Sequence, residues 1–148
     1  MSSIAVDAHL ERAKRHRKVG DALRDAGDEW AAVCHFYSAY HVVRYALRTD
    51  PIFDDTTALQ RLHRELTPDV AEIARHHGRG GRTPREWGIN DAVVYLYRPI
   101  AATYHKLHQA SVAVRYESGI GAPDLGRVDG WLADIWDAHE AGNLRAPS

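Results

Sequence analysis

Apolar residues recur at every third or fourth position along most of the chain, whereas the alternation of apolar and polar residues that marks strands is scarce. This spacing predicts helices, and Gly, Pro, Asn, Asp and Thr residues separate the predicted segments. The first predicted helix covers residues 6–26 and stops at Gly27. Its expected inward face comprises Val6, Leu10, Ala13, Val19, Leu23 and Ala26. The pattern as a whole indicates an all-α protein.

The next segment, residues 29–48, is apolar on nearly every side. One side carries Trp30, Val33, Cys34 and Tyr37, and another carries Phe36, Tyr40, Val43 and Leu47. A helix without a polar face is buried, so we expect this segment to be the central helix, with Asp28 as its N-cap. Pro51 ends it, because the residue before a proline is disfavoured in the helical region.

The middle of the chain mixes helix signals with helix breakers. A third predicted helix has three inward leucines, Leu59, Leu62 and Leu66. It is broken at Thr67 and Pro68, where Thr67 can cap and Pro68 can open a continuation through His77. Residues 78–84 contain too much glycine for regular structure, so we expect an exposed, flexible loop there.

The second half of the chain predicts two more helices. The first is one long helix from Asp91 through Val114, because apolar residues keep their spacing across Pro99, where the helix kinks or restarts. Residues 119–126 form a linker. The last helix has one apolar face, formed by Trp131, Leu132, Ile135, Trp136 and His139. That face must pack on its own bundle or on a second copy of the chain.

Four or five helices joined by short loops predict an up-and-down helical bundle. We expect a single domain over residues 1–148, with residues 118–148 forming the linker and the C-terminal helix. A tetratricopeptide-like helix pair is the competing architecture, because Ala22, Gly27, Ala32 and Tyr37 loosely fit one. Such units need about three copies to bury a core, and no second copy occurs at that period.

Composition agrees with one globular domain, since the chain has 148 residues, of which 45% are hydrophobic and 26% charged. Nineteen Lys and Arg against twenty Asp and Glu give a formal charge of -1, so any nucleic-acid argument must rest on local features. The one cysteine, Cys34, has no partner in the chain, which suits a reducing cytoplasm. No apolar stretch is long enough for a membrane span, so we expect a cytoplasmic protein.

Two segments carry a family resemblance. The first reads WAAVCHFYSAYH over residues 30–41, and the second reads YHKLHQAS over residues 104–111 and continues to Arg115 and Tyr116. They resemble the HEPN superfamily, small helical bundles of bacterial toxins, defence systems and RNA-processing proteins. The resemblance covers roughly residues 28–116 and implies a HEPN-like bundle with an RNA-related role. It also implies a homodimer and an antitoxin or another protein as partner.

The nucleolytic members of that superfamily carry an arginine, four to six residues, and then a histidine. Arg98 and His105 are the clean match here. Seven positions make two helical turns, which places both side chains on one face of the helix. The resemblance implies that His105 acts as general acid or base while Arg98 holds the phosphate. Pro99 follows the arginine, where the superfamily usually has a polar residue.

A basic segment beside the glycine loop is the nucleic-acid-binding candidate. It contains Arg75, Arg79, Arg82 and Arg85 without an intervening acidic residue, and its glycines would let the backbone approach a phosphate. A flexible solvated loop is the competing interpretation. No nucleotide-binding glycine motif and no spaced set of metal ligands occur, so we expect neither a cofactor nor a metal.

Two functions from different classes therefore remain open. The first is an RNA-related role, including metal-independent endoribonuclease activity through Arg98 and His105. The second is a non-catalytic interaction module that binds a protein partner or a small ligand. The nuclease function requires Arg98 and His105 to be exposed together in a basic cleft, whereas the module allows either residue to be buried or turned away.

Overall fold

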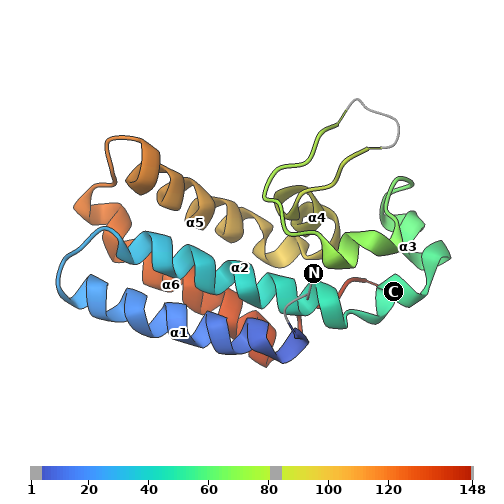
Figure 1. Cartoon of the computed structure of the whole chain (residues 1–148), viewed down its shortest axis with the longest axis horizontal. Helices are drawn as coiled ribbons and strands as arrows, with labels where there is room; N and C mark the ends of the chain where they lie inside the picture. Colours follow the sequence, from blue (N-terminus) through green and yellow to red (C-terminus); the bar gives the residue numbers. More distant parts are fainter. Residues whose placement is uncertain (1–4, 81–84, 148) are drawn as a thin grey trace.

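Six α-helices and two short 3-10 helices make up the computed structural model, which describes residues 5–80 and 85–147 (Figure 1). Over these residues it contains no named strand, and one isolated antiparallel bridge pairs Arg79 with Glu86. The α-helices are α1 (Val6–Asp25), α2 (Ala31–Thr49), α3 (Thr56–Leu62), α4 (Ile89–Leu96), α5 (Arg98–Tyr116) and α6 (Ala122–Glu140). The 3-10 helices are η1 (Pro51–Asp54) and η2 (Pro68–Glu72). The prediction of an all-α bundle is confirmed, but these residues contain six α-helices where four or five were predicted.

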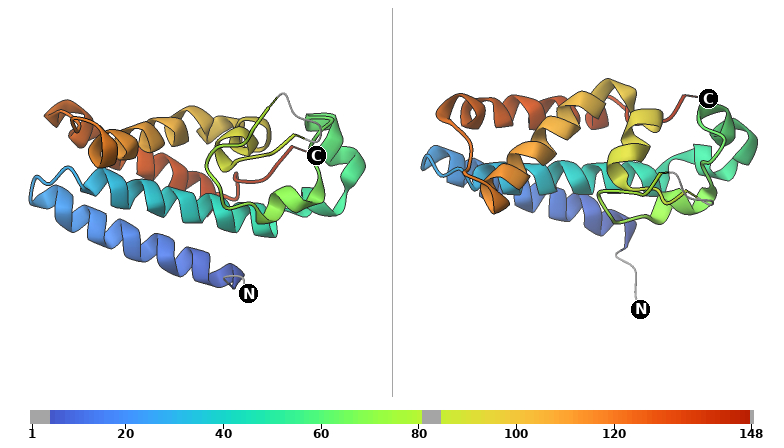
Figure 2. Two further views of the ribbon diagram at one scale, coloured as in Figure 1. Left: turned by 45° about the horizontal axis from the view of Figure 1, so that its top comes forward. Right: turned by 90° about the horizontal axis from the view of Figure 1, so that it is seen from above.

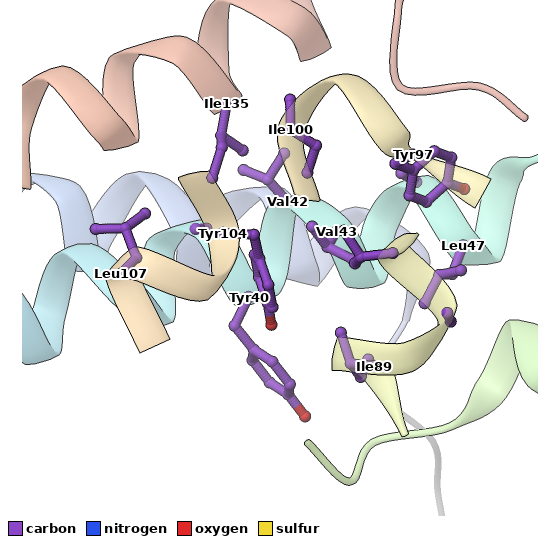
Figure 3. Close-up of a cluster of buried hydrophobic side chains, with 14 of the residues drawn as sticks. Tyr40, Val42, Val43, Leu47, Ile89, Tyr97, Ile100, Tyr104, Leu107 and Ile135 are labelled. Carbon is purple, nitrogen blue, oxygen red and sulfur yellow. The ribbon is translucent and has the colours of Figure 1, made fainter. Parts of the chain in front are cut away.

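Helix α2 lies at the centre, as its all-round apolar pattern predicts. It packs against α1, α5 and α6, and these four long helices run up and down beside one another (Figures 1 and 2). Thirteen of its residues are buried. Figure 3 shows Val42 and Val43 of α2 beside Ile100 and Tyr104 of α5 in the core. Burying this surface supplies the main driving force for the fold.

The buried face of α1 differs from the predicted one. Its buried residues are His9, Ala13 and Gly20, whereas Val19 is 44% exposed. Contacts with α2 decide which face of α1 is buried. At Ala13 the contact is a hydrogen bond, because the Ser38 hydroxyl of α2 donates to the Ala13 carbonyl over 2.7 Å. Close approach of two helices favours small residues at the contact, and Gly20 rather than Val19 lies there.

Residues 63–77 are not the predicted helical continuation. Helix α3 ends at Leu62, η2 is a single short 3-10 helix, and the following strap, residues 73–80, is irregular. The backbone carbonyl groups of the strap instead accept hydrogen bonds from the start of α4. Those of Arg75 and His76 accept from the backbone N–H groups of Ile89 and Asn90, at 2.8 and 3.0 Å. A helix start leaves such donors free, so the strap caps α4 instead of forming its own helix.

The segment predicted as one long helix, kinked or restarted at Pro99, consists of two helices, α4 and α5. The predicted restart is confirmed, and the prediction of one continuous element is wrong. The chain breaks at Tyr97, whose φ of -129° and ψ of 53° are not helical, and α5 restarts with Pro99 in its first turn. The Tyr97 side chain is fully buried and donates to Asp50 Oδ2 over 2.9 Å. This buried contact fixes the corner between α4 and α5, and the proline suits the first turn of the restarted helix.

Helix α6 begins at Ala122, inside the predicted linker, and its apolar face packs on its own bundle. Leu132, Ile135 and Trp136 are buried, and the Trp136 indole donates to the Ser38 hydroxyl over 3.0 Å. A second copy of the chain is therefore not needed to cover them. Over the part of the chain described here, no helix is both long and apolar enough to cross a membrane.

Candidate functional site

Arg98 and His105 lie in different hollows. Arg98 is exposed at the first position of α5 and lines a cavity of about 420 Å³ with residues of α3 and the C-terminal tail. His105 is half-buried two turns later and lines a separate hollow of about 310 Å³. The structure therefore does not bring the two predicted catalytic side chains to one cavity within the chain.

A larger groove runs between α5 and α6. Its volume is about 790 Å³, within the usual range for ligand sites. Helix α5 contributes Lys106 and Gln109, α6 contributes Arg127 and Trp131, and the strap contributes His77. Lys106 Nζ lies 6.0 Å from the centre of the Trp131 ring. The groove thus combines cations, an amide and an aromatic ring.

The groove continues into the hollow that contains His105. His77, His108 and Gln109 line both, and Asn90 joins them in the hollow. Phe36 of the central helix backs this surface, with its ring centre 4.8 Å from that of His108. Imidazoles from the strap and from α5 therefore share one continuous surface.

Asn90 sets the protonation pattern of two of these histidines. Its backbone carbonyl can only accept, so His105 Nε2, at 3.1 Å, carries the proton and the neutral ring has its lone pair on Nδ1. The side-chain amide nitrogen can only donate, so His108 Nδ1, at 2.8 Å, accepts and its proton is on Nε2. One residue at the start of α4 thereby orients two imidazoles of α5.

Burial keeps part of this surface uncharged. Burial and then the neighbouring His76, His77 and Arg115 lower the pKa of His108 to about 4. Burial is also the largest cause of the lowered pKa of His76. An imidazole with so low a pKa as that of His108 is neutral near pH 7. Lys106 and Arg127 bring positive charge to the groove, and Glu117 and Asp124 bring negative charge.

The arginines of the basic segment differ in their exposure and in their contacts. Arg75 and Arg79 are exposed on the strap, on either side of His77 in sequence. Arg85 is engaged, because its guanidinium lies 4.2 Å from the centre of the Trp87 ring and 4.0 Å from Asp91 Oδ1. Arg82 lies outside the described residues. Two of the four predicted nucleic-acid-binding arginines are therefore available at the surface.

Sequence reasoning misses Gln109 and Trp131, which line the groove, and Asn90, which lines the adjoining hollow. The apolar pattern places Trp131 on the same face as Trp136, yet five positions on a helix turn the side chain by about 140°. Trp136 accordingly points into the core while Trp131 borders the groove. Asn90 carries no local signal, since its role arises only where the start of α4 meets α5.

One set of possible metal ligands occurs among the described residues, at the opposite side of α2. Ligand atoms of Asp21, His35 and Asp129 lie within 4.8 Å of one another. The Arg24 guanidinium pairs with Asp129 and lies 3.9 Å from Asp21 Oδ1, so it already balances these carboxylates. We interpret the cluster as an ion-pair network that joins α1, α2 and α6.

The arrangement around the groove can stack a flat ring, contact a phosphate and exchange a proton through His105. Trp131 supplies the ring face, Lys106 and Arg127 supply charge, and His105 has an accepting nitrogen. Comparison of the chain with known proteins finds no match among family models, curated proteins or solved structures.

Proposed function

We propose that this protein is a HEPN-like bundle that binds single-stranded RNA in the groove between α5 and α6. The observation that carries the proposal is the combination of Trp131, Lys106, Arg127 and Gln109 around one groove of about 790 Å³. Single-strand sites pair an aromatic platform for bases with cations for the backbone, and an amide can reach a base edge. The family resemblance supports RNA as the ligand class.

The strap lengthens this surface in the direction that a bound RNA strand would follow. Its His77 borders the groove, and Arg75 and Arg79 are exposed on either side of it in sequence. Acidic residues also line the groove: Asp124 lies 3.7 Å from Arg127 Nη1, so a phosphate competes with it for that guanidinium. The mixed charge favours a short, moderately salt-sensitive contact over a long basic track.

The groove is formed by a single chain. The homodimer and the antitoxin or other protein partner that the resemblance implies are thus not required for RNA binding. They stay predictions, and the Trp131 and Trp136 positions no longer argue for a second copy, because Trp136 is buried within its own bundle.

Binding is tested with a labelled single-stranded RNA and purified full-length protein. We expect Trp131→Ala to weaken binding by about 1–3 kcal/mol through loss of stacking, and Lys106→Gln to weaken it while reducing the salt dependence. Arg15→Gln is the control, because Arg15 is an exposed cation of α1 that lines neither the groove nor the cavity containing Arg98. Equal affinity in all three variants would reject the groove, and absence of RNA binding would favour the interaction module.

Metal-independent RNA cleavage is the second candidate function, favoured by the tautomer that Asn90 imposes on His105. The His105 Nδ1 lone pair takes the proton of a ribose 2′-hydroxyl, whose oxygen attacks the adjacent phosphorus and forms a 2′,3′-cyclic phosphate. The bond to the 5′-oxygen breaks, and His77, which lines the same hollow, is the candidate donor of the proton that this oxygen takes. Lys106 stabilises the charge that develops on the phosphate.

Cleavage is tested in EDTA with RNA and with the all-deoxy strand of the same sequence. We expect the RNA alone to be cut, and His105→Ala to reduce the rate roughly 10²-fold or more, the scale of general acid-base catalysis. Undiminished cleavage by His105→Ala would assign the activity to another site or protein. Binding without any cleavage would leave the first proposal standing and dismiss the second.

A further inference from the structure

The cavity that contains Arg98 brings together three arginines from distant parts of the chain. Arg61 comes from α3, Arg98 from the start of α5 and Arg145 from the C-terminal tail. All three are exposed, and no acidic residue lines the cavity among the described residues. Its volume is about 420 Å³.

The charges of these arginines are not balanced within the part of the chain that the structure describes. None of the three takes part in an ion pair there, in contrast to Arg24, Arg85 and Arg127. Arg98 also opens a helix of nineteen residues, so it lies at the positive end of the helix dipole. Three unpaired guanidinium groups around one cavity form a site suited to an anion.

The remaining walls are mostly apolar. Leu62, Tyr95, Leu96, Pro99 and Pro147 line the cavity beside the arginines. A flat or apolar group packs well on such a surface, whereas an inorganic anion would leave it uncovered. The lining therefore suits a molecule with two parts, one anionic and one apolar.

Hydrogen bonds to Asp50 hold two of the segments that form the cavity. The tail that carries Arg145 is fastened by Ala146, whose N–H donates to Asp50 Oδ2 over 2.8 Å, and the Tyr97 hydroxyl donates to the same oxygen. Asp50 is itself buried at the end of α2. Both views in Figure 2 show the C-terminal tail beside the segment that contains α3.

We propose that this cavity binds a small organic phosphate. The phosphate lies among Arg61, Arg98 and Arg145, and the apolar part packs on Tyr95 and Leu96. Guanidinium groups bind phosphate oxygens through paired hydrogen bonds, which gives both charge and directionality. The site is separate from the groove between α5 and α6 and does not rest on the function proposed for it.

Calorimetric titration of the full chain tests the proposal with inorganic phosphate, phenyl phosphate and adenosine 5′-monophosphate. We expect at least one of the two esters to bind more tightly than inorganic phosphate and than its uncharged counterpart, phenol or adenosine. Arg98→Gln and Arg145→Gln should each weaken that ester roughly tenfold to hundredfold, the scale of a lost charged hydrogen bond. Arg15→Gln, an exposed arginine of α1 outside the cavity, should leave the affinity unchanged.

Three outcomes would overturn the proposal. The first is no detectable binding of any of the three phosphates. The second is binding that Arg98→Gln and Arg145→Gln do not weaken, or that Lys106→Gln abolishes, which would assign the ligand to the groove. The third is equal affinity for inorganic phosphate and both esters, which would remove the role of the apolar walls. Loss of RNA binding in the Lys106 variant with ester binding retained would separate the two sites.

Discussion

At the scale of single residues, Gly20 shows how one missing side chain decides a helix contact. It lies within α1, and a Cβ placed there would come within 2.7 Å of His35 Nε2 and closer still to Cδ2. The space that glycine leaves is filled by the imidazole of His35, which is 1% exposed and 3.0 Å from Asp21 Oδ1. Gly20 is therefore required for room and not for backbone conformation.

Gly20→Ala should destabilise the protein by about 1–3 kcal/mol, the usual cost of overpacking, in spite of the better helix propensity of alanine. Gly130→Ala in α6 is the matched control, because nothing lies within 4 Å of the added methyl group. It should stabilise by up to about 1 kcal/mol. Urea unfolding followed by circular dichroism measures both. A gain in stability for both variants would show that α1 can shift away from His35 without cost.

At the scale of elements, the central helix is the most predictable part of the fold. An apolar pattern on all sides leaves α2 no position other than the core, whatever its neighbours are. For α1 the same reasoning is right for Ala13 but misses His9 and Gly20, which are buried beside α2 although neither is an apolar residue. Pro99 predicts a kink or restart near this point, but the buried hydrogen bond from Tyr97 to Asp50, which joins distant parts of the chain, is not visible in the local pattern.

The candidate site is predictable only in part, for a related reason. Helical spacing places Arg98 and His105 on one side of α5, but the spacing contains no information on what packs beside each end. Arg98 meets α3 and the tail, while His105 meets Asn90 and the strap. Residues such as Asn90 act through neighbours that are brought together by the tertiary fold, and a single sequence does not display these neighbours.

At the scale of the whole molecule, buried imidazoles extend across the bundle on both sides of α2. His9 and His41 face each other with their Nδ1 atoms 3.0 Å apart, and His16 stacks on His41. Burial is the largest cause of the low pKa values, which are about 4 for His9 and about 3 for His41. Together with His108, these groups stay neutral in the folded protein at pH values where they are protonated in the unfolded chain.

This arrangement makes the fold sensitive to acid. Since the folded pKa values lie below the unfolded value of 6.5, the unfolded chain binds more protons, and the stability present above pH 6.5 declines as the pH falls toward 4. Each such histidine adds a slope of up to about 1.4 kcal/mol per pH unit. Urea unfolding at pH 7.5, 6 and 5 should show the decline, and His41→Gln should show a shallower one. A free energy of unfolding that is constant over this range would contradict the assignment.

The carboxylate of Asp50 has a consequence for the way the molecule opens. It accepts hydrogen bonds from Ile52 at the start of η1, from Tyr97 at the corner between α4 and α5, and from Ala146 in the tail. Segments that share one buried acceptor lose their bonds in the same event, so the tail and the corner form one cooperative unit in local unfolding. The walls of the arginine cavity therefore form and unfold together. A ligand bound there would stabilise the same end of the bundle that the Asp50 carboxylate stabilises.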